Sequence, residues 1–174
     1  CIRNRTPIAE EVAAKAERSG LIFSVEYQYP FPESMTGDPI RIAQVLRNLC
    51  ENAVEFTEKG SVTLRVKWDG GDGKFSFSVK DTGLGMTKQR QKSLFVLSSQ
   101  MHEMNDAGAG LGLVISKRLA GLMDGDLTVE SQLNAGSEFT LFVGKRASTD
   151  VAWIRKPPAP KSQRSQKRNI PTLT

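Results

Sequence analysis

The stretch KFSFSVKDTGLGM, residues 74–86, decides the fold because a strand pattern runs directly into a glycine turn. Phe75, Phe77 and Val79 alternate with polar residues, which is the period-2 pattern of a strand with one buried face. Asp81 continues the same phase, so its carboxylate is predicted to point to the buried side where the strand ends. Because burying an unpartnered charge is costly, this position predicts a binding role for the carboxylate.

Length and composition are those of a soluble globular domain. The chain has 174 residues, 39% of them hydrophobic and 25% charged, which is enough for one domain with a substantial core. No apolar run approaches the length of a membrane span, and the first residues lack a signal-peptide pattern. Cys1 and Cys50 offer neither a disulfide framework nor a metal-ligand spacing, so we expect a cytoplasmic setting and a small core residue at Cys50.

The basic net charge of +5 belongs to the end of the chain, where residues 151–174 hold six basic residues, no acidic ones and several prolines. We predict a domain over residues 1–147 and a basic, flexible tail or linker over 148–174. Such a tail is compatible with binding nucleic acid or acidic lipid, but a solvated linker to another domain of a longer parent protein is favoured. Neither nucleic acid nor direct membrane contact is expected for this chain.

Turn signals and periodicity divide the domain into alternating elements. Helices are predicted over 7–19, 38–57 and 110–123, and strands over 21–29, 61–69, 74–81, 126–131 and 137–143. Residues 87–107 look polar and irregular. Helices and strands are interleaved while several strands are hairpin neighbours, so the predicted fold is a two-layer α/β sandwich with a mixed sheet and helices on one face.

The helix predicted over 38–57 carries two stripes. Ile42, Leu46, Leu49, Ala53 and Phe56 form an apolar arc with Val45 and Cys50 at its edges. Beside this arc lies an amide stripe of Asn48, Asn52 and Glu55, with Glu51 adjacent. Because Asn is a mediocre helix former, the stripe needs a reason: it is either a solvated face or a set of oxygen ligands for Mg²⁺.

A glycine cluster, GAGLGL at residues 108–113, opens the last predicted helix. Backbone N–H groups at such a helix start suit a phosphate group. The cluster is not a GxxxxGK[ST] loop, and it is not a dinucleotide fingerprint because no strand runs directly into it. Alone, it is compatible with a simple tight turn.

Taken in order, these motifs resemble the N, G1, F and G2 boxes of the catalytic and ATP-binding domain of two-component sensor histidine kinases, hybrid kinases among them. The matching segments are NLCENAVEFT (48–57), DTGLGM (81–86), LFVLSSQ (94–100) and GAGLGLVISKRL (108–119). The resemblance covers about residues 5–145 and implies the Bergerat α/β sandwich, also found in DNA gyrase, mismatch-repair ATPases and ninety-kilodalton heat-shock chaperones. The cofactors it implies are ATP and Mg²⁺.

The resemblance also implies roles for individual residues. Asp81 would accept a hydrogen bond from the adenine amine, Gly83 and Gly85 would let the chain bend under the base, and Met86 would give an apolar contact. Glu51 and Asn52 would be the catalytic residues, Glu51 by polarising or orienting the acceptor imidazole, and Asn52 with Asn48 would bind Mg²⁺. The full set of implied nucleotide-binding residues is Asn48, Asn52, Glu55, Asp81, Gly83, Gly85, Met86, Phe95, Gly108, Gly110, Leu111 and Gly112.

Several positions depart from the family pattern on the phosphate side. Glu55 stands where a lysine is usual, Ala109 replaces a threonine, and Val96 with Leu97 replaces a common Glu-Pro pair. The short lid, residues 87–107, also holds acidic residues in its later part, Glu103 and Asp106. Adenosine recognition therefore looks intact, while weak handling of the triphosphate is predicted.

Three functions compete at this stage. The favoured one is a catalytic domain that phosphorylates a histidine on the dimerisation domain of its parent protein, with a response regulator or receiver domain downstream. The family's acceptor histidine lies on an upstream helix, whereas His102 lies in the lid, so the chain is not expected to phosphorylate itself. The alternatives are a degenerate nucleotide-sensing or regulatory module and an ATPase clamp of the gyrase or chaperone kind, which the short lid disfavours.

Overall fold

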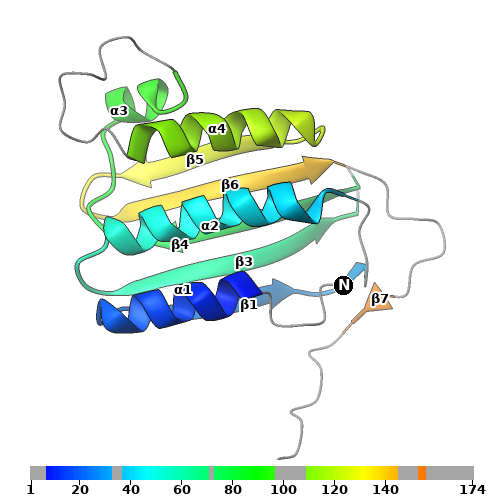
Figure 1. Ribbon diagram of the computed structural model, residues 1–174, viewed down its shortest axis with the longest axis horizontal. Coiled ribbons are helices and arrows are strands. Elements are labelled where there is room, and N and C mark those ends of the chain that lie inside the picture. Colours follow the sequence, from blue (N-terminus) through cyan, green and yellow to red (C-terminus); the bar gives the residue numbers. More distant parts are fainter. Residues whose placement is uncertain (1–6, 33–36, 71–72, 97–108, 145–152, 156–174) are drawn as a thin grey trace, which may run out of the picture.

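The protein is a two-layer α/β sandwich with its helices on one face of a five-stranded sheet (Figure 1). The computed structural model describes residues 7–32, 37–70, 73–96, 109–144 and 153–155. Its helices are α1 (Pro7–Arg18), α2 (Pro39–Glu55), α3 (Lys88–Ser93) and α4 (Ala109–Leu122). Its strands are β1 (Ile22–Gln28), β2 (Phe31–Pro32), β3 (Ser61–Asp69), β4 (Lys74–Asp81), β5 (Asp126–Gln132), β6 (Gly136–Gly144) and β7 (Trp153–Ile154).

The large sheet is mixed, as predicted. Its strand order is β1-β3-β4-β6-β5; β1 pairs with β3 in parallel, and the other three pairs are antiparallel. Parallel neighbours need a long crossover connection, which is usually a helix, and α2 lies in the segment that joins β1 to β3. The helices α1, α2 and α4 cover one face of the sheet (Figure 1).

The long helix α2 starts where the sequence signals place it. Asp38 caps it: Oδ1 accepts hydrogen bonds from the N–H groups of Ile40 (3.0 Å) and Arg41 (3.1 Å), and Pro39 occupies the first helical position. The helix ends at Glu55, and Phe56 is its C-terminal cap with φ −92° and ψ 9°.

The buried residues confirm the predicted buried side of β4 and correct the predicted apolar face of α2. Phe75, Phe77, Val79 and Asp81 are all buried. On α2 the predicted arc was wrong at its end: Phe56 is 39% exposed, because it follows the last helical residue and no longer keeps the helical phase. Val45, Leu46, Leu49, Cys50, Ala53 and Val54 form the buried face instead.

Three elements were not expected. Part of the segment predicted to be irregular forms α3, which is capped by the Thr87 hydroxyl accepting from the Arg90 N–H at 3.3 Å. Strand β7 lies within the predicted tail and pairs antiparallel with β2, which follows the strand predicted over residues 21–29 in a stretch without a predicted strand. Leu97, His102, Glu103, Asp106, Gly108 and most of the basic tail lie outside the described residues. In the described ranges, no helix combines the length and apolar character of a membrane span.

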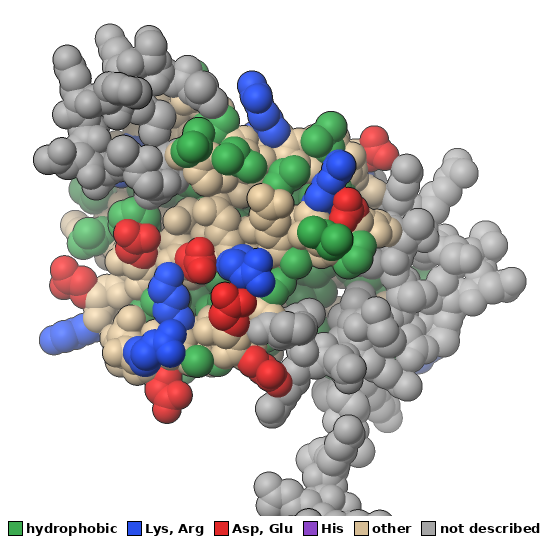
Figure 2. All heavy atoms as spheres, viewed as in Figure 1, with side chains coloured by type: hydrophobic (Ala, Val, Ile, Leu, Met, Phe, Trp, Pro, Cys, Tyr) green, Lys and Arg blue, Asp and Glu red, His purple; other side chains and the backbone are tan. Residues whose placement is uncertain are grey.

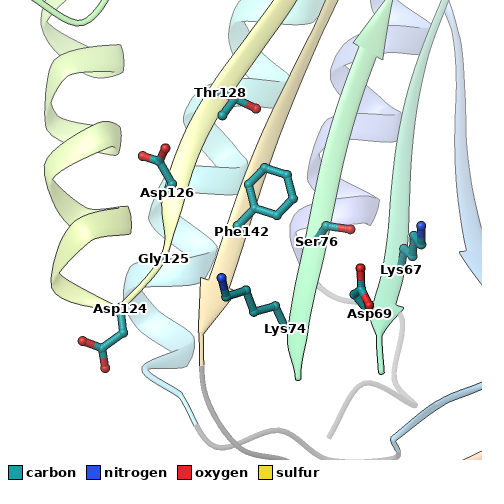
Figure 3. A pocket seen from close by; sticks show the side chains of 9 residues that line it. All are labelled: Lys67, Asp69, Lys74, Ser76, Asp124, Gly125, Asp126, Thr128 and Phe142. Carbon is teal, nitrogen blue, oxygen red and sulfur yellow. The ribbon is translucent and has the colours of Figure 1, made fainter. Parts of the chain in front are cut away.

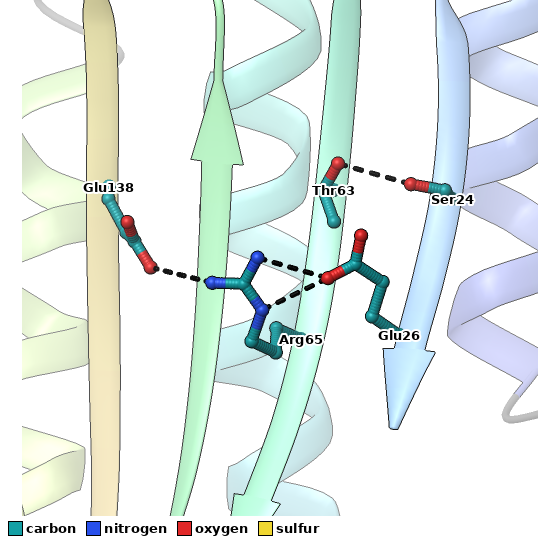
Figure 4. Close-up of polar contacts among 5 residues, drawn as sticks. All are labelled: Ser24, Glu26, Thr63, Arg65 and Glu138. Carbon is teal, nitrogen blue, oxygen red and sulfur yellow. Dashed lines mark hydrogen bonds and ion pairs between the residues drawn. The ribbon is translucent and has the colours of Figure 1, made fainter. Parts of the chain in front are cut away.

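The uncovered face of the sheet is polar. Arg65 on β3 forms ion pairs with Glu26 on β1 (3.0 Å) and Glu138 on β6 (3.7 Å), and the Ser24 and Thr63 hydroxyls lie 3.1 Å apart (Figure 4). The helical face is different, because hydrophobic side chains gather on it over α4 (Figure 2); Leu111, Ile115 and Leu122 are exposed there. The open face is therefore a solvated surface, and such exposed ion pairs contribute little to the stability of the domain.

Candidate functional site

The candidate site lies at one end of the sandwich, where the C-terminal end of α2, the end of β4 and the start of α4 meet (Figure 1). Helix α2 is joined to α4 by the Asn48 amide, whose Nδ2 donates to Ser116 Oγ at 3.0 Å. It is joined to the turn after β4 by the Leu84 N–H, which donates to the Phe56 carbonyl at 3.4 Å. The four sequence motifs thus supply neighbouring parts of one region, as far as their residues are described.

Asp81 is the buried charge of this region. Its side chain is 4% exposed, and Oδ1 accepts two backbone hydrogen bonds, from Gly83 at 2.8 Å and from Ser137 at 3.2 Å. Among the described residues no donor approaches Oδ2, so that oxygen is left for an outside donor. Burial raises the pKa of Asp81 above its ordinary value, while the two N–H donors lower it and offset part of the rise.

The turn after Asp81 requires glycine. A Cβ at Gly83 would overlap the Phe56 carbonyl oxygen, and one at Gly85 would overlap the Gln132 carbonyl oxygen. Gly85 also has φ +63°, in the left-handed region that favours glycine. The turn is therefore pressed between α2 and the β5–β6 hairpin, with no room for larger residues.

Met86 ends this turn and is held through its backbone. Its N–H donates to Ser131 Oγ at 2.8 Å, and its carbonyl accepts from Gln91 Nε2 at 3.1 Å. The same Gln91 Nε2 donates to the Ser131 carbonyl at 2.8 Å. Ser131, Ser137 and Gln91 were not predicted as site residues, although Ser131 and Ser137 continue the buried phase of their strands just as Asp81 does.

The amide stripe divides into buried and exposed members. Asn52 is 8% exposed, and within the described ranges its Nδ2 is buried without a hydrogen-bond partner. Asn48 is half-buried, with Oδ1 directly against Gly112 of α4, where a Cβ would collide with it. Glu51 is half-buried and Glu55 is exposed. The stripe is therefore not simply a solvated face.

The remaining predicted residues lie around α4. Gly110 is in its first turn and Leu111 is 55% exposed. Phe95 is half-buried, with its ring centroid 5.1 Å from Lys117 Nζ. That lysine also pairs with Asp126 at 2.6 Å, and its hydrogen bond lowers the pKa of Asp126. The ring contact thus places Phe95 beside the junction of α4 and β5.

A separate hollow lies on the open face of the sheet (Figure 3). It has a volume of about 390 Å³ and is lined by residues such as Lys67, Lys74 and Asp126. None of the predicted site residues lines it. The buried carboxylate and the buried amide lie on the helical side, so this hollow is distinct from the candidate site.

A match to a protein-family model agrees with the resemblance found in the sequence motifs. Residues 37–147 match the family described as histidine kinase-, DNA gyrase B- and HSP90-like ATPase. The chain belongs to this family. Within it, the chain is a catalytic ATPase domain of the sensor histidine kinase type.

Curated relatives agree with this placement. The chain is 39% identical over 135 residues to the aerobic respiration control sensor protein ArcB of Escherichia coli K12, covering 75% of this chain and 17% of ArcB. It is 42% identical over 113 residues to the sensor histidine kinase RcsC of Salmonella typhimurium, covering 63% of this chain and 12% of RcsC. The ATPase domain thus spans less than a fifth of the length of these relatives.

Solved structures show the same fold. Full-length ShkA in complex with AMPPNP superposes with a TM-score of 0.67 at 34% identity, covering 80% of this chain and 29% of ShkA. The nucleotide-free catalytic domain of the histidine kinase ThkA superposes with a TM-score of 0.62 at 25% identity, covering 80% of this chain and 91% of ThkA. The mixed sandwich of the ATPase domain is therefore that of histidine kinase catalytic domains.

Proposed function

We propose that this ATPase domain binds ATP together with Mg²⁺ and transfers the γ-phosphate to a histidine on the dimerisation domain of its parent protein, in two-component signal transduction. The observation that carries the proposal is the buried Asp81 carboxylate, with Oδ1 held by two backbone donors and Oδ2 left for a ligand. The ShkA structure holds AMPPNP, an analogue of ATP, which supports an adenine nucleotide as the ligand. The proposed downstream partner is a response regulator or receiver domain in the cytoplasm.

Adenine recognition follows from the fixed orientation of this carboxylate. A free acceptor oxygen matches the exocyclic amine of adenine, whereas guanine has an oxygen at the equivalent position and would leave the buried acceptor unsatisfied. The close-packed glycines at positions 83 and 85 keep the turn under the base, and Met86 supplies the apolar contact. These residues would bind the adenine base and fix its orientation.

A magnesium ion fits the amide stripe. Asn52 presents a buried amide with an unpartnered end, and the oxygen and nitrogen ends of an amide can exchange places by rotation. Mg²⁺ keeps several waters and needs few protein ligands, so one or two amide oxygens suffice beside phosphates. Asn52 is the main proposed ligand, because Asn48 Oδ1 is packed against Gly112 of α4 while its Nδ2 donates to Ser116. When bound, the ion would neutralise charge on the phosphates.

The other residues of the site would act on the phosphates and the acceptor. The first backbone N–H groups of α4, at Ala109 and Gly110, have no helical partner and suit a phosphate oxygen. Glu51, half-buried next to Asn52, would orient an incoming imidazole, which is already a nucleophile when neutral. Catalysis then depends mainly on positioning the reactants.

The direct test is calorimetric titration of the domain with ADP, ATP and GTP, with and without Mg²⁺, followed by phosphotransfer to a histidine-bearing dimerisation domain. We expect adenine nucleotides to bind in preference to GTP and Mg²⁺ to strengthen binding. Equal affinity for GTP and ATP, or no nucleotide binding at all, would overturn the proposal.

Replacing Asn52 tests the metal ligand. Asn52→Ala is expected to remove the Mg²⁺-dependent part of nucleotide affinity, roughly tenfold or about 1.4 kcal/mol, while affinity in EDTA stays unchanged. Gln44→Ala, at an exposed position on the same helix, is the control. Metal dependence that is equal in both variants would assign the amide a structural role.

A nucleotide-sensing or regulatory module is the second candidate, and Glu55 favours it. This carboxylate is exposed at the end of α2, one turn beyond Glu51 and on the stripe of Asn52. A negative charge there would repel a triphosphate more than a diphosphate, although solvent screens the repulsion. Weak gain in affinity from ADP to ATP is the expected sign of this function.

Reversing that charge should restore triphosphate binding. Glu55→Lys is expected to raise affinity for a non-hydrolysable ATP analogue by roughly twofold to fivefold, with a smaller change for ADP, because exposed charges contribute about 1 kcal/mol or less. Adding Ala109→Thr should increase the gain. Calorimetry at low and high salt measures it, and Glu17→Lys on α1 is the charge-matched control. Equal affinities in Glu55→Lys and the control would remove the support for a degenerate phosphate site.

A further inference from the structure

The two residues proposed to contact adenine are connected by a chain of hydrogen bonds that passes through Ser131. This side chain lies on β5, in phase with Leu127 and Val129, and so faces the helical side of the sheet near its end. Its Oγ is 2.8 Å from the Met86 nitrogen, 2.9 Å from the Gly136 carbonyl oxygen and 3.0 Å from Ser137 Oγ. One hydroxyl therefore touches the turn and the opposite strand of its own hairpin.

These three distances allow a single complete assignment of donors. A serine hydroxyl donates one hydrogen bond and accepts two. The Gly136 carbonyl can only accept and the Met86 N–H can only donate, so Ser131 donates to Gly136 and accepts from Met86. Its second acceptor position then takes the Ser137 hydroxyl proton. The hydroxyl is fully satisfied, and its orientation is fixed.

Ser137 extends the chain to the carboxylate. Its side chain is 8% exposed, and its N–H donates to Asp81 Oδ1 at 3.2 Å. The opposite side of Met86 is also held, because Gln91 Nε2 bridges the Met86 and Ser131 carbonyls at 3.1 and 2.8 Å. Met86 and Asp81 thus have a defined spacing, set by Ser131 with Gln91 as its support.

We propose that Ser131 is a positioning residue for base selection: it holds the Met86 turn and the Asp81 carboxylate in register, so that the pocket matches the adenine amine. This inference rests on the proposed function, because it concerns the same nucleotide site. Without the hydroxyl, the Met86 N–H and the Ser137 O–H both lose their acceptor. The Met86 end of the turn is then held more loosely, while the Leu84 carbonyl still accepts from the Asn134 N–H of the hairpin at 2.6 Å.

The test compares ADP with inosine diphosphate, which carries an oxygen in place of the adenine amine. In Ser131→Ala the ratio of the two affinities is expected to fall about fivefold, in line with the loss of an ordinary hydrogen bond. Ser131→Thr restores the hydroxyl and should restore the ratio. Ser24→Ala is the matched control, because it removes a hydroxyl hydrogen bond of 3.1 Å on the opposite face of the sheet.

Hydrogen exchange in the nucleotide-free domain gives an independent measurement. The Met86 amide should exchange several-fold faster in Ser131→Ala than in wild type or Ser24→Ala. Gln91→Met removes both hydrogen bonds of the Gln91 carboxamide while keeping a side chain of similar size. This variant should also lower the ratio of the affinities for ADP and inosine diphosphate, and it tests the proposal if Ser131→Ala does not fold.

The outcomes separate the two proposals. A wild-type domain with equal affinity for ADP and inosine diphosphate would overturn adenine selection itself, whatever the variants do. A selective wild type whose ratio is unchanged in Ser131→Ala and Gln91→Met would overturn the positioning role alone. So would an equal loss of affinity for both nucleotides, since that is the result of general destabilisation.

Discussion

Asp81→Asn is expected to lower affinity for ADP by about 10- to 100-fold, because hydrogen bonds to charged groups contribute about 1.5–3 kcal/mol, while leaving the domain folded. The orientation of the new amide is dictated by the backbone. Two N–H groups, from Gly83 and Ser137, point at Oδ1 and require an oxygen there. The NH₂ group must then occupy the place of Oδ2, where it would face the adenine amine donor to donor.

The same argument predicts that Asp81→Asn changes the nucleotide preference as well as losing affinity for ADP. An NH₂ group in the place of Oδ2 can donate to the carbonyl of inosine diphosphate, so the variant should bind this nucleotide better relative to ADP than wild type does. Calorimetric titration with both nucleotides measures this change in relative affinity. A variant that binds ADP as tightly as wild type would remove Asp81 from adenine recognition.

The buried carboxylate should also make stability depend on pH. Burial raises the pKa of Asp81 in the folded state, so the folded domain holds this proton more tightly than the unfolded chain does. Its contribution to stability is therefore present below the ordinary pKa of an aspartate and is lost as pH rises through the folded pKa. In the nucleotide-free domain, the melting temperature of Asp81→Asn relative to wild type should rise from about pH 4 to pH 7. A constant difference would contradict the raised pKa.

The strand that ends at Asp81 could be predicted from sequence because every signal agreed. Strict alternation and the glycine-rich sequence GGDG at residues 70–73 predicted β3 and β4 with the bounds observed. The alternation in β4 also placed Asp81 on the buried side. The same rule, a polar residue in the buried phase at a strand end, applies to Ser131 and Ser137. Applied to all strands, it would have found these two serines, although not Gln91, which also holds Met86 but lies on α3.

Other features had no local signal. Helix α3 is six residues long and has no buried residue, so it lacks the apolar period by which a helix is recognised. Strands β2 and β7 are two residues each and lie more than a hundred residues apart in the chain, so only tertiary packing pairs them. The close contact of Gly112 with Asn48 depends on how α2 meets α4, which sequence spacing does not give.

Gly85→Ala is expected to destabilise the domain by about 2–4 kcal/mol, the range of strained backbone and overpacked sites. Two causes act together. Gly85 has φ +63°, which an alanine adopts at a cost, and its Cβ would overlap the Gln132 carbonyl oxygen and lie 2.9 Å from that of Gly136. Neither oxygen can move freely, because both belong to the backbone of the β5–β6 hairpin.

Gly121→Ala is the matched control for this substitution. Gly121 lies in the last turn of α4, and its added Cβ would meet no atom outside the helix within 4 Å, so alanine there should be neutral or stabilise by up to about 1 kcal/mol through helix propensity. Urea denaturation of both variants measures the free energy of unfolding. Because the turn links Asp81 to Met86, Gly85→Ala should also lose ADP binding under conditions where it remains folded, and Gly121→Ala should keep it. Equal stabilities in the two variants would show that the turn can move away from the hairpin, which would also weaken the case for a fixed spacing between Asp81 and Met86.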